Sequence, residues 1–167
     1  MPTSDRRAQE KQGSGPVALK IVSFLALVLT ALALAPGGAH LFALPNKIDL
    51  AQQPYFVVQG IYRGWALLGA VLIGALIANL VLAILLRGRG APFWFALAGF
   101  VLVGATLAIF FTWTFPANQA TNNWTIAPDN WRALRTQWEY SHAVNAVLTF
   151  FALCAVTLSV LTRLERH

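Results

Sequence analysis

The stretch FWFALAGFVLVGATLAIFFTWTF, residues 93–115, decides the fold because none of its side chains is charged. A helix rises about 1.5 Å per residue, so a run of this length crosses the roughly 30 Å hydrocarbon core of a bilayer. Three more runs share this character, at 17–35, 65–86 and 143–161. Membrane β-strands would instead alternate in polarity over about ten residues. The sequence therefore predicts an all-α protein, a four-helix transmembrane bundle with helices over about 17–44, 61–86, 93–115 and 131–162.

The composition supports a membrane location. The chain has 167 residues, of which 57% are hydrophobic and only 11% are charged, whereas soluble domains carry about 25% charged residues. This imbalance argues against a water-soluble enzyme, a disordered chain and a nucleic-acid-binding domain. The formal net charge of +6 comes from basic residues that flank the apolar runs. We therefore expect the lipid bilayer, and no nucleic acid, as a partner.

The basic residues also predict the orientation of the bundle. Eight of the twelve Lys and Arg fall on one side of a four-pass chain: Arg6, Arg7, Lys11, Lys20, Arg87, Arg89, Arg163 and Arg166. The other four, Lys47, Arg63, Arg132 and Arg135, fall on the opposite side. Because cytoplasmic loops carry the excess of Lys and Arg, both termini are predicted to be cytoplasmic (N-in/C-in).

The polar, Gly- and Ser-containing residues 1–15 predict a disordered cytoplasmic arm, followed by a single four-helix membrane domain over 16–167. A cleaved signal peptide is the alternative for the first apolar run, since basic residues precede it and Ala-Leu-Ala precedes Pro36. However, the run exceeds the usual 7–15 residues of such a segment, and helical character resumes after Gly38. We therefore expect a retained helix.

The last predicted helix carries a polar and aromatic stripe. Spacings of three and four residues place on one face Trp131, Arg135, Trp138, His142, Asn145 and Thr149. A polar stripe in a membrane helix normally faces the bundle, because a polar group facing lipid would be left unpaired. His142 is expected near the extracytoplasmic boundary, where His40, Arg63 and Asn118 reach the same level.

Five of the six Trp fall at this extracytoplasmic end. Two interpretations are open. The aromatic residues line a pocket that opens outward, or they form an interfacial belt. Belts usually occur at both interfaces, which favours a pocket for at least some of them.

Glu139 and His142, three residues apart, raise the alternative of a metal site. A second Glu-x-x-His pair, as in di-iron bundles, is absent from the sequence. His40, Glu139 and His142 would form a two-His, one-carboxylate set for a single metal ion. The other interpretation pairs Glu139 with Arg135, four residues away, and then no metal or other cofactor is expected.

These residues carry a resemblance to a known family. With His40 near the end of the first helix, Pro116-Ala117-Asn118 after the third, and Trp131-x-x-Leu134-Arg135-x-x-Trp138-x-x-x-His142 before the fourth, the chain resembles the anthrone oxygenase-like family. Its members are small four-helix membrane proteins, mostly uncharacterised and bacterial. The resemblance implies oxidation of an activated carbon in a fused aromatic substrate by O₂, without a recognised organic cofactor, in the bacterial inner membrane.

The resemblance also implies roles for individual residues. His142 would be the base, and Arg135, with Asn118 or Trp138, would help to hold the substrate. Many members carry a basic residue three positions after the His, where this chain has Asn145. In addition to His142 and Arg135, the candidate substrate-binding residues are His40, Arg63, Asn118, Trp131, Trp138 and Asn145.

Two functions follow as hypotheses. The first is a cofactor-independent oxygenase with an outward-facing Trp/His/Arg pocket for a hydrophobic aromatic, anthrone-like substrate. An imidazole suits proton removal near neutral pH, and a nearby cation would stabilise the resulting anion. The alternative is a non-catalytic membrane protein that binds a lipid-like ligand or a partner subunit. Small residues at every fourth position, Ala66, Ala70, Gly74 and Ala78, leave homo-oligomerisation open.

Overall fold

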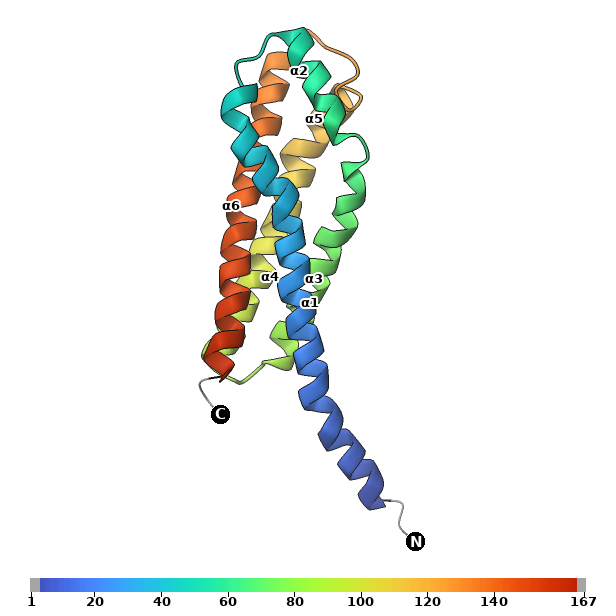
Figure 1. Ribbon diagram of the computed structural model, residues 1–167, viewed down its shortest axis with the longest axis vertical. Coiled ribbons are helices and arrows are strands. Elements are labelled where there is room, and N and C mark those ends of the chain that lie inside the picture. The colour runs from blue at the N-terminus through green and yellow to red at the C-terminus, as the bar shows by residue number, and fades with distance from the viewer. Residues whose placement is uncertain (1–3, 165–167) are drawn as a thin grey trace.

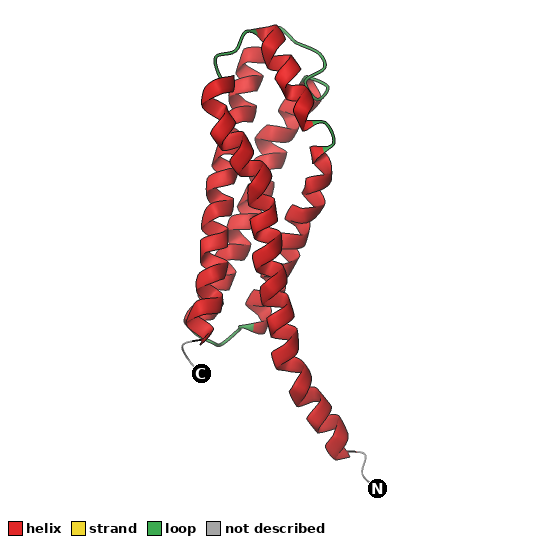
Figure 2. Ribbon diagram, in the orientation of Figure 1, coloured by secondary structure: helices red, strands yellow, loops and turns green. Residues whose placement is uncertain are grey.

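The protein is all-helical, as predicted. The computed structural model describes the backbone of residues 4–164 and the side chains of residues 17–163, and no strand occurs in these residues (Figure 2). The α-helices are α1 (Ser4–Lys47), α2 (Gln52–Gln59), α3 (Leu68–Leu85), α4 (Ala91–Ile109), α5 (Phe115–Ala120) and α6 (Trp131–Leu164). Two 3₁₀ turns, Gly60–Tyr62 and Trp65–Leu67, connect α2 to α3, and a π-helical turn, Phe110–Thr114, joins α4 to α5.

Four long helices form the bundle. α1 packs against α3 and α6, and α4 packs against the same two helices. α2 and α5 lie at one end of the bundle, and the chain ends lie at the other, beyond which the start of α1 projects (Figure 1). The helical segments Val17–Lys47, Trp65–Leu85, Ala91–Ala120 and Trp131–Arg163 are long and apolar enough to cross a membrane. Large apolar side chains such as Phe24 and Trp94 are exposed on the outside, as expected for a multi-pass membrane protein in contact with lipid.

Glycines allow the helices to approach one another closely. A Cβ atom on Gly99 of α4 would lie 2.7 Å from Cγ2 of Val156 on α6. A Cβ on Gly37 of α1 would lie 3.3 Å from the Cα of Ala146 on α6. Small residues at helix contacts are typical of membrane bundles, in which close van der Waals packing drives association. The contact of Gly37 with Ala146 sets the distance between α1 and α6 near the candidate site.

The first helix is longer than predicted. It continues through Pro36, Gly37 and Gly38 to Lys47, and it begins at Ser4. Residues 4–15 are therefore helical in the structure, where the sequence predicts disorder, whereas residues 1–3 lie outside the described residues. Extending an existing helix fixes one residue per added hydrogen bond, without the cost of a new nucleus. The membrane-spanning part of α1 supplies that nucleus.

The second and third membrane helices also differ from their predicted limits. Arg63 is extended and Gly64 has φ +87°, a left-handed conformation that favours glycine. The helical chain therefore restarts at Trp65 instead of residue 61. The third helix runs on to Ala120, through the π-helical turn Phe110–Thr114 that directly precedes Pro116.

Candidate functional site

The two histidines singled out in the sequence meet inside the bundle. On α1, His40 follows Gly37 by one helical turn, and on the antiparallel α6, His142 precedes Ala146 by one turn. Because Gly37 and Ala146 bring the two backbones together, the imidazole rings stack, with centroids 4.1 Å apart and planes inclined by 23°. His40 is buried, and its Nδ1 has no hydrogen-bond partner among the described residues. We call these two residues the histidine pair.

Aromatic rings surround the histidine pair. The Trp138 ring contacts both imidazoles edge-on, at 5.0 Å from His40 and 4.3 Å from His142. Tyr62 lies 4.3 Å from His40, and Trp65 lies 5.6 Å from it. These rings pack against one another and are not spread around the perimeter. Trp124 and Trp131 belong to the same interior cluster at this end of the bundle, whereas Trp113 is exposed.

A buried ion pair lies beside this cluster. Lys47, the last residue of α1, pairs with Glu139 of α6, with Nζ 2.9 Å from Oε2. Lys47 also donates a hydrogen bond of 3.0 Å to the Tyr62 hydroxyl and lies 5.3 Å from the Trp138 ring centroid. Glu139 is therefore paired with Lys47, not with Arg135 as one interpretation of the spacing proposed. Sequence reasoning missed Lys47, although a lysine that ends an apolar helix at the level of Glu139 was a usable signal.

Two residues of α2 complete the surroundings of Glu139. The Tyr55 hydroxyl donates a hydrogen bond of 3.0 Å to Oε1, and Gln59 Nε2 donates one of 3.4 Å to the same atom. Burial, together with the negative charge of Glu139, raises the pKa of Tyr55 well above its usual range. Tyr55 therefore remains a protonated donor, and the buried carboxylate is held by one cation and two neutral donors.

Arg135 and Trp131 lie in a neighbouring group and do not contact the histidine pair. Arg135 Nη1 donates a hydrogen bond of 2.6 Å to the carbonyl oxygen of Leu50, which ties the segment after α1 to α6. The Arg135 guanidinium lies 4.9 Å from the Trp131 ring centroid and 5.4 Å from that of Tyr55. Arg135 is two helical turns from His142. The cation close to the histidine pair is therefore Lys47.

The remaining candidate residues occupy different positions. Asn118 accepts a hydrogen bond of 2.8 Å from Trp138 Nε1 and so fixes the indole that contacts both histidines. Asn145 is half-buried one turn from His142, and its Oδ1 has no partner among the described residues. Arg63 is exposed in the turn before α3. The structure thus brings together His40, His142 and Trp138, adds Asn118 through a hydrogen bond, and leaves Arg63 at the surface.

The alternative metal set of His40, Glu139 and His142 is not assembled as a cluster. Within residues 17–163, no group of three or more His, Cys, Asp and Glu could hold a metal ion. Glu139 directs its oxygens to Lys47, Tyr55 and Gln59. A carboxylate held in this way is poorly suited to serve as the third ligand of a metal at the histidine pair.

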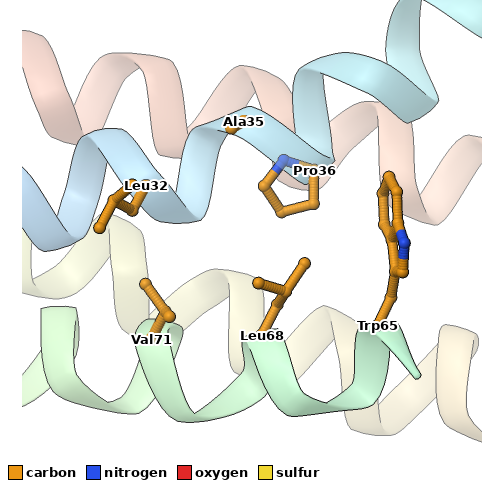
Figure 3. A pocket seen from close by; sticks show the side chains of 6 residues that line it. All are labelled: Leu32, Ala35, Pro36, Trp65, Leu68 and Val71. Atoms are coloured by element: carbon orange, nitrogen blue, oxygen red, sulfur yellow. The ribbon is translucent and has the colours of Figure 1, made fainter.

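An apolar groove leads from the outside of the bundle toward the cluster. It lies between α1 and α3, has a volume of about 520 Å³, and is lined by Leu32, Ala35, Pro36, Trp65, Leu68 and Val71 (Figure 3). Leu32 and Leu68 are exposed, so the groove opens on the lipid-facing surface. Trp65 lies at one end of the groove (Figure 3). Its ring contacts His40. The groove therefore ends at a side chain that touches the histidine pair.

No family model, curated protein or solved structure matches this chain. The chemistry that this chain can perform therefore follows from the residues of the site. The site combines two imidazoles, a hydroxyl in contact with a buried ammonium group, and flat aromatic walls beside an apolar groove. Such a set can remove a proton from a hydrophobic molecule and stabilise the anion that results.

Proposed function

We propose that this protein is an integral membrane oxygenase, resembling the anthrone oxygenase-like family, that acts on a flat hydrophobic substrate without a cofactor. One observation carries the proposal: His40, which stacks on His142, contacts Trp65, and Trp65 lines one end of an apolar groove that opens toward lipid. Its volume falls within the 300–1,000 Å³ range of small-molecule pockets. An apolar substrate dissolved in the bilayer would reach the base through this groove.

The proposed reaction converts a CH₂ group between aromatic rings into a carbonyl, with O₂ consumed and water released. An imidazole of the histidine pair removes one proton and leaves a carbanion that is delocalised onto the substrate oxygen. The carbanion transfers electrons to O₂ and forms a C–O bond, which gives a hydroperoxide once it is protonated. The second C–H proton is then removed, the O–O bond breaks and hydroxide leaves, so that one water is lost in total and the ketone forms. We place the protein in the bacterial inner membrane, with both chain ends in the cytoplasm.

Oxygen consumption by the purified protein in nanodiscs tests this proposal. With anthrone as substrate, we expect one O₂ consumed per anthraquinone formed. His142→Ala should lower the rate by about 10²–10⁴-fold, the usual contribution of a general base. His167→Ala, which replaces the last residue of the chain, is the matched control and should retain the rate. Equal O₂ uptake by the wild-type protein, His142→Ala and a protein-free nanodisc would contradict the proposal.

A non-catalytic role is the second candidate, and the dense packing of the cluster favours it. Trp131, Trp138 and Glu139 are almost fully buried and engaged with other residues of the bundle. In that case the cluster is a structural network, and the groove binds a lipid-like molecule or a partner subunit. His142→Ala would then lower the melting temperature in detergent and leave O₂ uptake at the background rate in every variant.

A further inference from the structure

Within residues 17–163, Tyr62 carries a hydroxyl proton that has no acceptor. Its hydroxyl oxygen lies 3.0 Å from Lys47 Nζ. An ammonium group has three donors and no acceptor, so Lys47 must be the donor and Tyr62 the acceptor. No acceptor for the hydroxyl proton of Tyr62 is found within residues 17–163. The side chain is only half-buried. Tyr62 can therefore donate a hydrogen bond to a bound molecule.

Lys47 makes this donor stronger. The Lys47 side chain is 4% exposed, and its ammonium group also holds Glu139 at 2.9 Å. In such a water-poor setting, a hydrogen bond from a charged donor polarises the hydroxyl that accepts it. The Tyr62 hydroxyl therefore donates more strongly to a developing negative charge than an isolated phenol would. Lys47 acts through Tyr62 and is a positioning and polarising residue.

The base lies next to this donor. The rings of Tyr62 and His40 are 4.3 Å apart, and the buried Nδ1 of His40 has no hydrogen-bond partner. Within residues 17–163, an imidazole nitrogen without a hydrogen-bond partner thus lies on the ring next to a polarised hydroxyl whose proton has no acceptor. A ketone with an acidic neighbouring C–H needs these two groups, because its carbon loses a proton while charge builds up on its oxygen.

We propose that the site enolises hydrophobic ketones, with the histidine pair as base and Tyr62 as the acid. The C–H bond breaks, its proton moves to an imidazole nitrogen, and its electron pair forms the C=C bond of the enol. The C=O π electrons move onto the carbonyl oxygen, which takes the proton of Tyr62. When the enol returns to the ketone, its O–H proton goes back to the Tyr62 oxygen, and the imidazolium, after exchange with D₂O, delivers a deuteron to the carbon. This inference rests on the proposed function only for the identity of the base, and it requires no O₂.

Deuterium exchange under argon tests the inference. The probe is 2-tetralone, a two-ring ketone with an acidic benzylic CH₂, incubated in D₂O with the protein in nanodiscs and followed by NMR. We expect exchange faster than in protein-free nanodiscs. Loss of one oxyanion donor costs about 10²–10³-fold, so Tyr62→Phe should lose most of the acceleration. Tyr140→Phe, which changes an exposed tyrosine, should keep it.

Tyr62→3-fluorotyrosine separates chemistry from packing. This variant keeps the ring contacts with His40 and the hydrogen bond from Lys47, and it makes the hydroxyl more acidic. If Tyr62 donates to the substrate oxygen, the exchange rate should rise above that of the wild type. An unchanged rate would overturn the inference, even if Tyr62→Phe were too unstable to measure.

The two proposals can fail separately. Tyr62-dependent exchange under argon without O₂ uptake on anthrone would support enolisation and reject the oxygenase. O₂ uptake that depends on His142 but not on Tyr62, with no exchange of 2-tetralone, would support the oxygenase and overturn enolisation. Absence of both activities would overturn enolisation as well as the oxygenase.

Discussion

The ion pair between Lys47 and Glu139 makes these two residues depend on each other. Both side chains are almost completely buried, and a buried charge without a partner is far more costly than either a neutral pair or an intact ion pair. The chain tolerates a lysine and a glutamate in its interior because each satisfies the other, while Tyr62, Tyr55 and Gln59 supply further hydrogen bonds.

Replacing one member of this pair should lower the stability of the protein much more than replacing both. We expect Glu139→Leu to lower the free energy of unfolding by about 3–5 kcal/mol, because Lys47 is left buried and unpaired. The double variant Lys47→Met/Glu139→Leu should be clearly more stable than the single variant. Unfolding titrations with SDS in mixed micelles measure both. If the double variant proved as unstable as Glu139→Leu, the pairing would not be the source of the stability.

Tyr55 should make the protein sensitive to alkali. Burial and the charge of Glu139 raise the pKa of Tyr55, so the folded state keeps a proton that the unfolded state loses above about pH 10. Stability should therefore be unaffected by this group below pH 10 and fall above it, by up to about 1.4 kcal/mol per pH unit. In Tyr55→Phe this component of the decline should disappear. Tyr140→Phe, at an exposed position, should retain the wild-type slope.

At the scale of the elements, the contact between α1 and α6 decides whether the histidines meet. At Gly37 the α6 backbone comes close to α1, whereas a Cβ on Gly38, the next residue, would make only an ordinary contact, with Phe42 at 3.9 Å. The two neighbouring glycines therefore form a natural pair for comparison. Only the first allows the close approach between the helices.

Gly37→Ala should push α1 away from α6 and loosen the histidine stack. A Cβ at 3.3 Å from the Cα of Ala146 is too close without backbone movement, and overpacking of this kind costs about 1–3 kcal/mol. Gly38→Ala should be neutral or slightly stabilising, since alanine is the better helix former. SDS titrations compare the two. Equal stabilities would show that the helix approach does not depend on Gly37.

At the scale of the whole molecule, the distribution of charge matches the shape of the bundle. The turn between α3 and α4 carries Arg87 and Arg89 and lies at the same end as the last turn of α6, which carries Arg163 (Figure 1). At the opposite end, Lys47 is neutralised within the protein by Glu139. Lys47 is therefore not one of the exposed basic residues at that end.

Labelling of single cysteines tests the orientation. The natural Cys154 is first replaced by Ser, and Arg89→Cys or Asp129→Cys is then introduced at opposite ends of the bundle. In spheroplasts of a bacterial host, a membrane-impermeant maleimide should label Asp129→Cys readily and Arg89→Cys only after lysis. The reverse pattern would show that the chain ends face outward.

The sequence by itself determined the helical class and the number of apolar helices. Uncharged runs of about 20 residues admit few other structures in lipid, because every backbone hydrogen bond must be made within the segment. The short helix α2 was missed, since eight residues carry too weak a periodic signal. The predicted end of the first helix and the predicted start of the second were wrong. The start of the second helix depends on the positive φ of Gly64, which the sequence pattern does not reveal.

Only the tertiary structure shows which polar residues lie together. Spacing along α6 groups Arg135 with His142, yet Arg135 binds the Leu50 carbonyl and the cation near the histidines is Lys47. Helical periodicity describes a face of one helix, whereas the pairing of His40 with His142 and of Lys47 with Glu139 depends on how closely α1 and α6 approach. That distance is set by the contact of Gly37 with Ala146, residues 109 positions apart in the chain, and periodicity within one helix cannot specify it.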